Sequence, residues 1–178
     1  MIAVAVLTEN VFLIGFMGVG KTTVARRLAR DLGVASIDVD SYLHRKHGKD
    51  ANQLFKQRGE KGLRRLEAVA LAECSAMGPA VVSCGEGIVA LPRNRKLIVE
   101  QGFAVLLESS KEGSLARVRS LRTRPLLAHG CDTDKLWCER KPLYDEVARA
   151  HIDVQGKSTA EVAAEVTAVL KKVGIYRP

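Results

Sequence analysis

Aromatic residues are scarce in this sequence, at 4% of the chain, and they are not interleaved with its basic residues. Proteins that bind single-stranded nucleic acids commonly stack the bases on aromatic side chains, so we expect no nucleic acid as the main partner. The formal net charge of +8 alone leaves nucleic acids, anionic membranes and small anionic substrates open. We expect small anionic ligands, although two such ligands explain only part of this charge.

Paired cysteines and long apolar runs are also missing. The four cysteines, at positions 74, 84, 131 and 138, form no C-x-x-C pair and no His/Cys spacing typical of a zinc site. No apolar run approaches the roughly 20 residues of a membrane span. The apolar N-terminal segment is interrupted by Glu9 and Asn10, and it lacks the basic stretch and cleavage site of a secretory signal. We therefore expect reduced thiols, no membrane partner and a cytoplasmic location.

Short apolar runs alternate with segments of helical period along the chain. Such runs indicate strands that are buried on both faces, and strands separated by helices are joined by crossovers. Both features predict an α/β fold of three layers, α/β/α, with a parallel sheet in the middle. No linker or repeat divides the chain, so we expect a single domain over residues 1–178. The predicted strands are 11–15, 35–40, 80–84, 103–107 and 151–154.

Apolar residues recur every three or four positions in three segments, which places them on one buried face of a helix. Further helices are predicted after Pro92, Lys111 and Thr133. The last helix opens with Ser158 and Glu161, spaced as a capping box. The residues expected to face the core are Val24, Leu28 and Leu32, then Leu63, Leu66, Ala70, Cys74 and Met77, and finally Val162, Val166, Val169 and Val173.

The segment GFMGVGKT, Gly15–Thr22, fits the phosphate-loop pattern G-x-x-x-x-G-K-[ST]. A predicted strand precedes it and an amphipathic helix follows it, as this motif requires. Backbone N–H groups and the positive end of the helix would hold phosphates. Lys21 would reach the β- and γ-phosphates, and the Thr22 hydroxyl would coordinate Mg²⁺. The N-K-x-D guanine signature is missing, which argues against a GTPase.

Two carboxylates, Asp38 and Asp40, end the second predicted strand. Residues two apart on a strand share one face, and the carboxyl end of a strand beside the phosphate loop looks onto the ligand crevice. One carboxylate could hold Mg²⁺ through water, and the other could accept a proton from a substrate hydroxyl. The alternative is a pair of turn-forming aspartates without a chemical role.

Arginines at positions 64, 124 and 140 are further candidates for the site. The planar guanidinium fork suits carboxylates and phosphates. Taken singly, Arg64, Arg124 and Arg140 are each more typical of a solvated charge on a helix.

The motifs GFMGVGKTT, DVD, GEKGLRRLE, SCGEG, RPLL and RKPLY occur in an order that resembles shikimate kinase, from about Val11 to Asp153. The resemblance implies the nucleoside-monophosphate-kinase-like fold, with a five-stranded parallel sheet, a substrate-binding segment at about 39–67 and a lid at about 118–132. It implies transfer of the γ-phosphate of ATP to the 3-hydroxyl of shikimate in aromatic amino-acid biosynthesis, by a monomer.

The resemblance also implies roles for individual residues. Asp40 would be the base, Asp38 would support Mg²⁺ through water, and Glu67 would orient Arg64. On the nucleotide side, the implied residues are Gly18, Val19, Gly20, Lys21, Thr22 and Thr23 in the phosphate loop, Arg117 packed on adenine, and Arg124 brought by the lid onto the transferred phosphate. On the substrate side, they are Arg64 and Arg140 around the shikimate carboxylate, Asp40 at the hydroxyl, and the turn Gly85, Glu86 and Gly87.

The turn Gly85–Gly87 departs from the pattern that the resemblance implies, since the family usually has three glycines there and this chain has Glu86 in the middle. In one interpretation the side chain points away and only the backbone serves the substrate. In the other the carboxylate faces the pocket, where it repels the substrate or pairs with Arg64 or Arg140. The second interpretation keeps two alternative functions open: a kinase of another hydroxy acid such as gluconate, and a non-catalytic protein that binds nucleotide.

Overall fold

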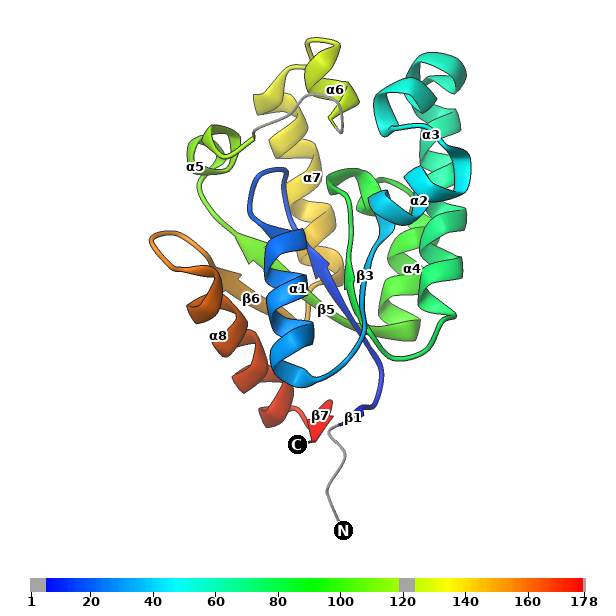
Figure 1. Cartoon of the computed structure of the whole chain (residues 1–178). Coiled ribbons are helices and arrows are strands. Elements are labelled where there is room, and N and C mark those ends of the chain that lie inside the picture. The colour runs from blue at the N-terminus through cyan, green and yellow to red at the C-terminus, as the bar shows by residue number, and fades with distance from the viewer. Residues whose placement is uncertain (1–5, 119–123, 178) are drawn as a thin grey trace.

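A five-stranded parallel sheet forms the middle of the molecule in the computed structural model, which describes residues 6–118 and 124–177. The strand order is β3-β4-β2-β5-β6, and every neighbouring pair is parallel (Figure 1). The strands are β2 (Asn10–Ile14), β3 (Ser36–Asp38), β4 (Val81–Ser83), β5 (Gly102–Glu108) and β6 (Ala150–Asp153). The three-layer α/β/α prediction is therefore confirmed.

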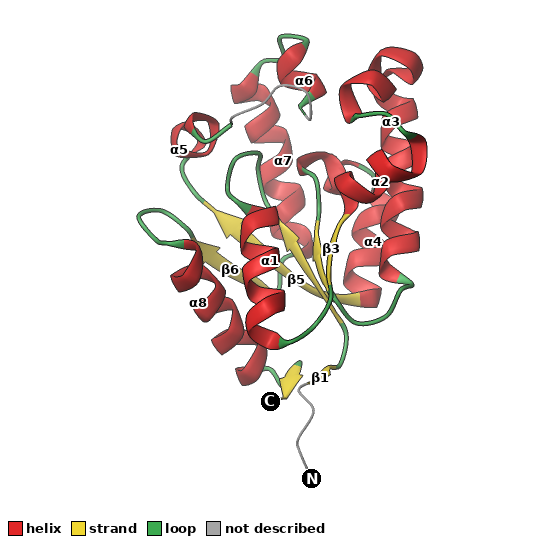
Figure 2. Cartoon of the chain, in the orientation of Figure 1, coloured by secondary structure: helices red, strands yellow, loops and turns green. Residues whose placement is uncertain are grey.

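Helices cover both faces of this sheet (Figure 2). On one face lie α1 (Lys21–Leu32) and α8 (Thr159–Lys172), which contact each other. The other face carries α3 (Ala51–Ser75), α4 (Pro92–Gln101) and α7 (Thr133–Val147). The shorter elements are α2 (Val39–His47), the 3₁₀ helix η1 (Glu86–Ala90), α5 (Lys111–Ala116), α6 (Pro125–Ala128), and a small antiparallel pair, β1 (Val6–Leu7) with β7 (Tyr176–Arg177).

The residues predicted to face the core are buried where they lie inside a helix, except Leu66 and Val169, which are partly buried against the core. Val24, Leu28 and Leu32 are buried in α1, and the capping box of Ser158 and Glu161 is present at the start of α8. Met77 and Val173, by contrast, are 57% and 48% exposed, so their predicted burial is wrong. Both residues lie beyond the helix ends, at Ser75 and Lys172, where the helical period no longer sets the direction of a side chain.

Two predicted boundaries are also wrong. The strand predicted over 35–40 ends at Asp38, because the Asp38 side chain accepts a hydrogen bond from the backbone N–H of Ser41 and caps helix α2. Asp40 therefore lies in the first turn of a helix and not on a strand. The helix predicted from the apolar period of Leu63, Leu66 and Ala70 begins already at Ala51, and Gly59 interrupts it with φ 65° and ψ 179°. The segment before Lys61 is polar, so the apolar periodicity of the sequence did not predict this first part of the helix.

Elements above the carboxyl edge of the sheet frame a crevice. In Figure 1, α5 and α6 stand over one side of this edge, and α2 with the start of α3 stands over the other. The predicted substrate-binding segment, 39–67, corresponds to α2 and the first part of α3. Of the predicted lid, 118–132, residues 119–123 lie outside the described part of the chain.

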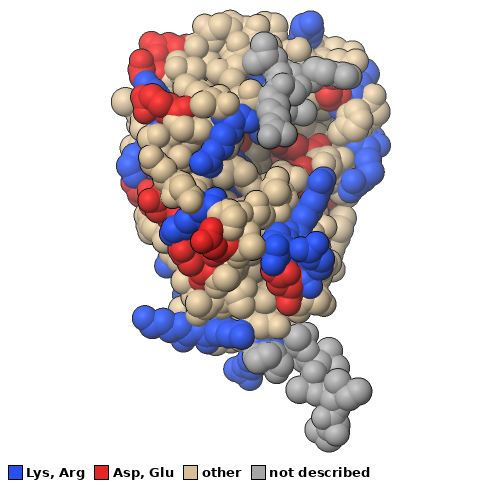
Figure 3. Space-filling model, turned by 60° about the vertical axis from the view of Figure 1, so that its left-hand side comes forward, with Lys and Arg blue, Asp and Glu red and all other residues tan. Residues whose placement is uncertain are grey.

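Two features of the structure concern nucleic acid and membrane partners: the distribution of charge on the surface and the length and polarity of the helices. In Figure 3, Lys and Arg form separate groups on the visible face, several of them beside Asp or Glu. Within residues 6–118 and 124–177, no helix is both long and apolar enough to cross a membrane.

Candidate active site

The phosphate loop joins β2 to α1 and closes around Lys21. The buried Nζ of Lys21 donates hydrogen bonds to the carbonyl oxygens of Gly15, at 2.7 Å, and Phe16, at 2.8 Å. Gly18 has φ 82°, and a Cβ there would lie 1.8 Å from the carbonyl oxygen of Ser114. Glycine is required at this position for both reasons. Gly20 at the N-cap of α1 has no side-chain capping hydrogen bond, which suits a helix start that holds an anion.

Burial, and after it the nearby Arg124 guanidinium, lower the pKa of Lys21 from its ordinary value of 10.5 to about 8. Phosphates of a bound nucleotide favour the charged amine. We therefore expect ATP binding to take up a proton between about pH 8 and pH 10.5, approaching one proton per ATP at about pH 9. Calorimetric titrations in buffers of different ionisation enthalpy measure this uptake. Lys21→Arg is the matched control, because arginine stays charged throughout. Equal uptake by the two chains would contradict the expectation.

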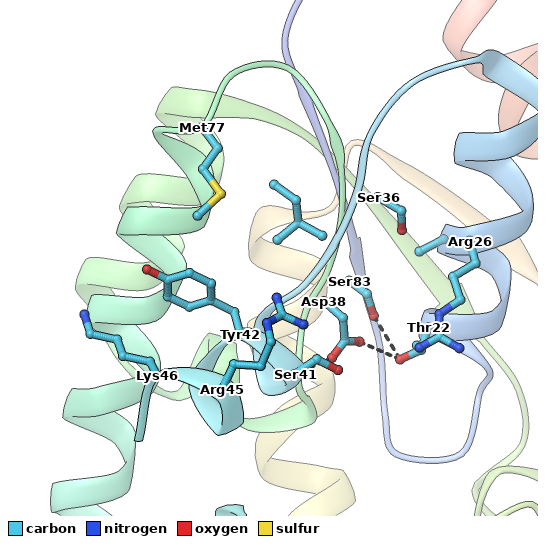
Figure 4. Close-up of a pocket in the computed structure, with 12 residues that line it drawn as sticks. Thr22, Arg26, Ser36, Asp38, Ser41, Tyr42, Arg45, Lys46, Met77 and Ser83 are labelled. Atoms are coloured by element: carbon cyan, nitrogen blue, oxygen red, sulfur yellow. Dashed lines mark hydrogen bonds between the residues drawn. The ribbon is translucent and has the colours of Figure 1, made fainter. Parts of the chain in front are cut away.

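Three oxygen-bearing side chains meet beside the loop, where Mg²⁺ was predicted. Thr22 Oγ1 donates to Asp38 Oδ2 at 2.7 Å and lies 3.3 Å from the Ser83 hydroxyl (Figure 4). The other Asp38 oxygen accepts the N–H of Ser41 at 2.8 Å. Hydroxyl and carboxylate oxygens suit a hard cation, so these residues fit Mg²⁺. The sequence reasoning missed Ser83, whose one signal is that it is a polar residue near the end of the buried run AVVSC.

A cavity of about 740 Å³ on the other side of the phosphate loop fits a nucleotide. The predicted nucleotide residues Gly18, Val19, Gly20, Thr23 and Arg117 line it, together with Lys157. Arg117 follows α5 directly, and it lines this cavity together with the phosphate loop. The sequence reasoning missed Lys157 and Thr159, whose only local signal is the cap of the last helix.

Asp40 faces the crevice from the first turn of α2. A cavity of about 610 Å³ is lined by Thr22, Asp38, Asp40 and Arg124. The predicted magnesium ligands and the predicted base therefore line the same cavity. Arg124 Nη1 lies 3.9 Å from Asp40 Oδ2. Burial raises the pKa of Asp40, the neighbouring Asp38 carboxylate adds to the rise, and the Arg124 guanidinium opposes it. A raised pKa suits a carboxylate that takes up a proton during the reaction.

Arg64 and Arg140, from α3 and α7, are both buried near the same turn. Arg64 Nη1 donates to both carboxylate oxygens of Glu67, at 3.0 and 2.8 Å, so Glu67 orients Arg64 as implied. Burial raises the pKa of Glu67, against the pull of the Arg64 guanidinium. The Nε groups of Arg64 and Arg140 have no hydrogen-bond partner among the described residues. Buried polar groups are rarely left unpaired, so these two guanidinium groups could hold an anion. We call Arg64 and Arg140 the carboxylate clamp.

The Glu86 carboxylate is largely buried between the two arginines of the carboxylate clamp. Its Oε1 is 3.4 Å from Arg64 Nη2, and its Oε2 is 3.7 Å from Arg140 Nε. The interpretation in which this side chain points away is therefore wrong. No described residue other than glycine has a positive φ, so Glu86 costs little backbone strain. The Tyr144 hydroxyl, which the sequence reasoning gave no role, donates to the Glu86 carbonyl oxygen at 2.7 Å and anchors the turn.

Gly85 and Gly87 leave room for the side chains of neighbouring elements. Neither has a positive φ. A Cβ on Gly85 would lie 2.7 Å from Asp40 Oδ1, and a Cβ on Gly87 would lie 1.9 Å from Arg64 Nη1. The two glycines therefore admit the side chains of Asp40 and Arg64 to the turn, and this brings the predicted base and the carboxylate clamp together.

A phosphate loop, a carboxylate with a raised pKa and a pair of buried arginines thus share one edge of a five-stranded parallel sheet. This combination defines a small-molecule kinase of the P-loop class with the nucleoside-monophosphate-kinase-like fold. The family model described as shikimate kinase matches residues 17–171. The chain belongs to the shikimate kinase family, and it is an ATP-dependent phosphotransferase.

Relatives and solved structures agree with this assignment. The chain is 37% identical to the shikimate kinase of Geobacter sulfurreducens, over 92% of each protein. It is also 37% identical to that of Bordetella pertussis, over 93% of this chain and 79% of the relative. The structure of shikimate kinase from Acinetobacter baumannii in complex with shikimate matches with a TM-score of 0.87 and 32% identity, over 93% of this chain and 94% of that one. The resemblance found in the motifs is confirmed.

A gluconokinase from Sinorhizobium meliloti also matches, with a TM-score of 0.64 and 20% identity over 94% of each chain. At this identity the match shows a shared fold alone. The comparisons therefore support shikimate kinase over a gluconate kinase or a non-catalytic protein.

Proposed function

We propose that this chain transfers the γ-phosphate of ATP to the 3-hydroxyl of shikimate, with Mg²⁺ as the metal. The observation that carries the proposal is the carboxylate clamp, buried beside Asp40 across a glycine turn. A substrate that fills this site needs a carboxylate for Arg64 and Arg140 and a hydroxyl for Asp40. Shikimate has both groups, and a shikimate complex is known for the relative from Acinetobacter baumannii.

The chemistry divides among groups that the crevice already holds. Asp40 accepts the proton of the 3-hydroxyl as its oxygen attacks the γ-phosphorus, the bond to the β–γ bridging oxygen breaks, and ADP leaves. Lys21 and Arg124 neutralise the charge on the transferred group, which is the main requirement of phosphoryl transfer. Thr22 and Asp38 would hold Mg²⁺, which would supply further neutralisation of the phosphate charge.

The remaining proposals concern binding and surroundings. The phosphate loop from Gly18 to Thr23 holds the phosphates, and Arg117 packs on the adenine in the adjoining cavity. Segments 39–67 and 118–132 act as substrate-binding segment and lid, and closure excludes water as a competing acceptor. We further propose a monomer in the cytoplasm, without a nucleic acid partner.

A coupled assay of ADP release tests this function with ATP and Mg²⁺ in the presence of shikimate, of gluconate or of no acceptor. We expect release to depend on shikimate. Equal release with shikimate and without an acceptor would contradict the proposal, and release that depends on gluconate alone would favour the second kinase.

A further inference from the structure

Glu86 places a carboxylate of the protein in the position where the carboxylate clamp is expected to hold the substrate's carboxylate. It contacts one guanidinium through each of its two oxygens, at 3.4 Å to Arg64 and 3.7 Å to Arg140. All three side chains are 10% exposed or less, so water screens these charges weakly.

The contacts of Glu86 are looser than those of Glu67. Charge-assisted hydrogen bonds between nitrogen and oxygen are commonly about 2.7–2.9 Å long. Glu67 meets Arg64 at 2.8 Å, whereas both contacts of Glu86 are longer. Glu86 Oε2 also lacks a hydrogen-bond partner among the described residues, as do the Nε groups of both arginines. Glu67 therefore fixes Arg64, while Glu86 neutralises the clamp without saturating it.

We propose that Glu86 determines the substrate preference of this kinase by occupying the carboxylate clamp before the substrate arrives. This inference rests on the proposed function. An acid must either displace the Glu86 carboxylate from Arg64 and Arg140 or share the clamp with it against like-charge repulsion. The chain thus binds an acid more weakly than it would without this charge. An uncharged analogue with the same hydroxyls does not meet this repulsion.

The backbone of the turn does not depend on the Glu86 side chain. Tyr144 holds the Glu86 carbonyl at 2.7 Å, and position 86 has no positive φ. Glu86→Gln keeps the shape of the side chain and removes its charge, and Glu86→Gly removes both. The two variants together separate the effect of the charge from an effect on folding, and a thermal melt of each checks the latter.

Glu60 offers a matched control. Its Oε1 lies 3.6 Å from the same Arg64 Nη2, but its side chain is 48% exposed. Glu60→Gln thus removes the same charge next to the same guanidinium from a solvated position, where an ion pair contributes little.

Steady-state kinetics with saturating ATP and Mg²⁺ on shikimate and on its uncharged methyl ester test the proposal in the native chain and the three variants. We expect Glu86→Gln and Glu86→Gly to lower the KM for shikimate about tenfold, with kcat changed less than about threefold. The preference for shikimate over the ester should rise by a similar factor. Glu60→Gln should change each quantity less than about threefold.

The opposite result identifies a different role. If the KM for shikimate rises in both Glu86 variants, the carboxylate positions the arginines, and the proposal is wrong. It is equally wrong if the KM and the preference stay unchanged. Calorimetric titration of the chains with shikimate, without ATP, distinguishes failure of the proposed function from failure of this inference. Tighter binding to Glu86→Gln without turnover by any of the chains would contradict the function and support the inference, and equal binding without turnover would contradict both.

Discussion

Asp40→Asn is expected to lower kcat for shikimate phosphorylation about 10²–10⁴-fold, the range that a positioned general base contributes. An amide at position 40 keeps the shape of the side chain and cannot accept the proton of the substrate hydroxyl. Asp38 cannot take over, because one of its oxygens accepts from Thr22 at 2.7 Å and the other from the Ser41 N–H at 2.8 Å. Single-turnover measurements on the variant report this chemical step directly.

The pH profile and a second variant separate the base from the metal site. Because burial raises the pKa of Asp40, the native activity should rise with pH through a value above that of an ordinary aspartate, and this limb should vanish in Asp40→Asn. Asp38→Asn should instead raise the Mg²⁺ concentration needed for half-maximal activity. An Asp40→Asn chain that keeps more than a tenth of the native kcat would remove Asp40 from the role of base.

Gly87→Ala is expected to lower kcat/KM for shikimate by at least about 100-fold, or about 2.7 kcal/mol. A Cβ at position 87 would lie 1.9 Å from Arg64 Nη1 and 2.2 Å from Arg64 Cζ. The guanidinium cannot yield cheaply, since it is buried and Glu67 holds it through two hydrogen bonds. Arg64 must therefore leave the carboxylate clamp, or the turn must shift. The affinity for ATP, measured by titration, should stay unchanged, because the atoms nearest to the new Cβ all belong to Arg64 and none to the phosphate loop.

A double-mutant cycle gives the control for Gly87→Ala. In an Arg64→Ala background the guanidinium that collides with the new Cβ is gone, so adding Gly87→Ala should cost less than about threefold. Neighbouring residues that share one interaction show this non-additivity. Additive losses in the cycle would mean that the glycine is needed for a reason other than the approach of Arg64.

Sequence patterns predicted the parts of this fold that local physics determines. Apolar runs predicted the buried strands, and a repeat of apolar residues predicted α1. The glycines between the first of these strands and α1 predicted the phosphate loop. Asp40 was misplaced because the alternation in SIDVD favours a strand, while the capping hydrogen bond from Ser41 to Asp38 starts a helix within it. Helical period also failed at Met77 and Val173, one or two residues past a helix end.

The contacts of Glu86 with the carboxylate clamp depend on tertiary structure. Glu86 meets Arg64 and Arg140 only because α3 and α7 both pack against η1. No local pattern in the sequence selects between a Glu86 side chain that points toward the arginines and one that points away. Pairing of Glu86 with Arg64 or Arg140 was one of the interpretations that the sequence left open, and only the structure selects it. Tyr144 and Glu86 are 58 residues apart in the sequence, so the hydrogen bond from the Tyr144 hydroxyl to the Glu86 carbonyl was not predictable from the sequence.

The most direct test of the central claim is the identity of the product that the native chain makes from ATP, Mg²⁺ and shikimate. Phosphorus NMR of the reaction mixture, with correlation to the ring protons, locates the transferred group. The account predicts a single new phosphomonoester coupled to the proton on C3, appearing together with ADP. Inorganic phosphate without a phosphoester, or a phosphate coupled to another ring position, would contradict it.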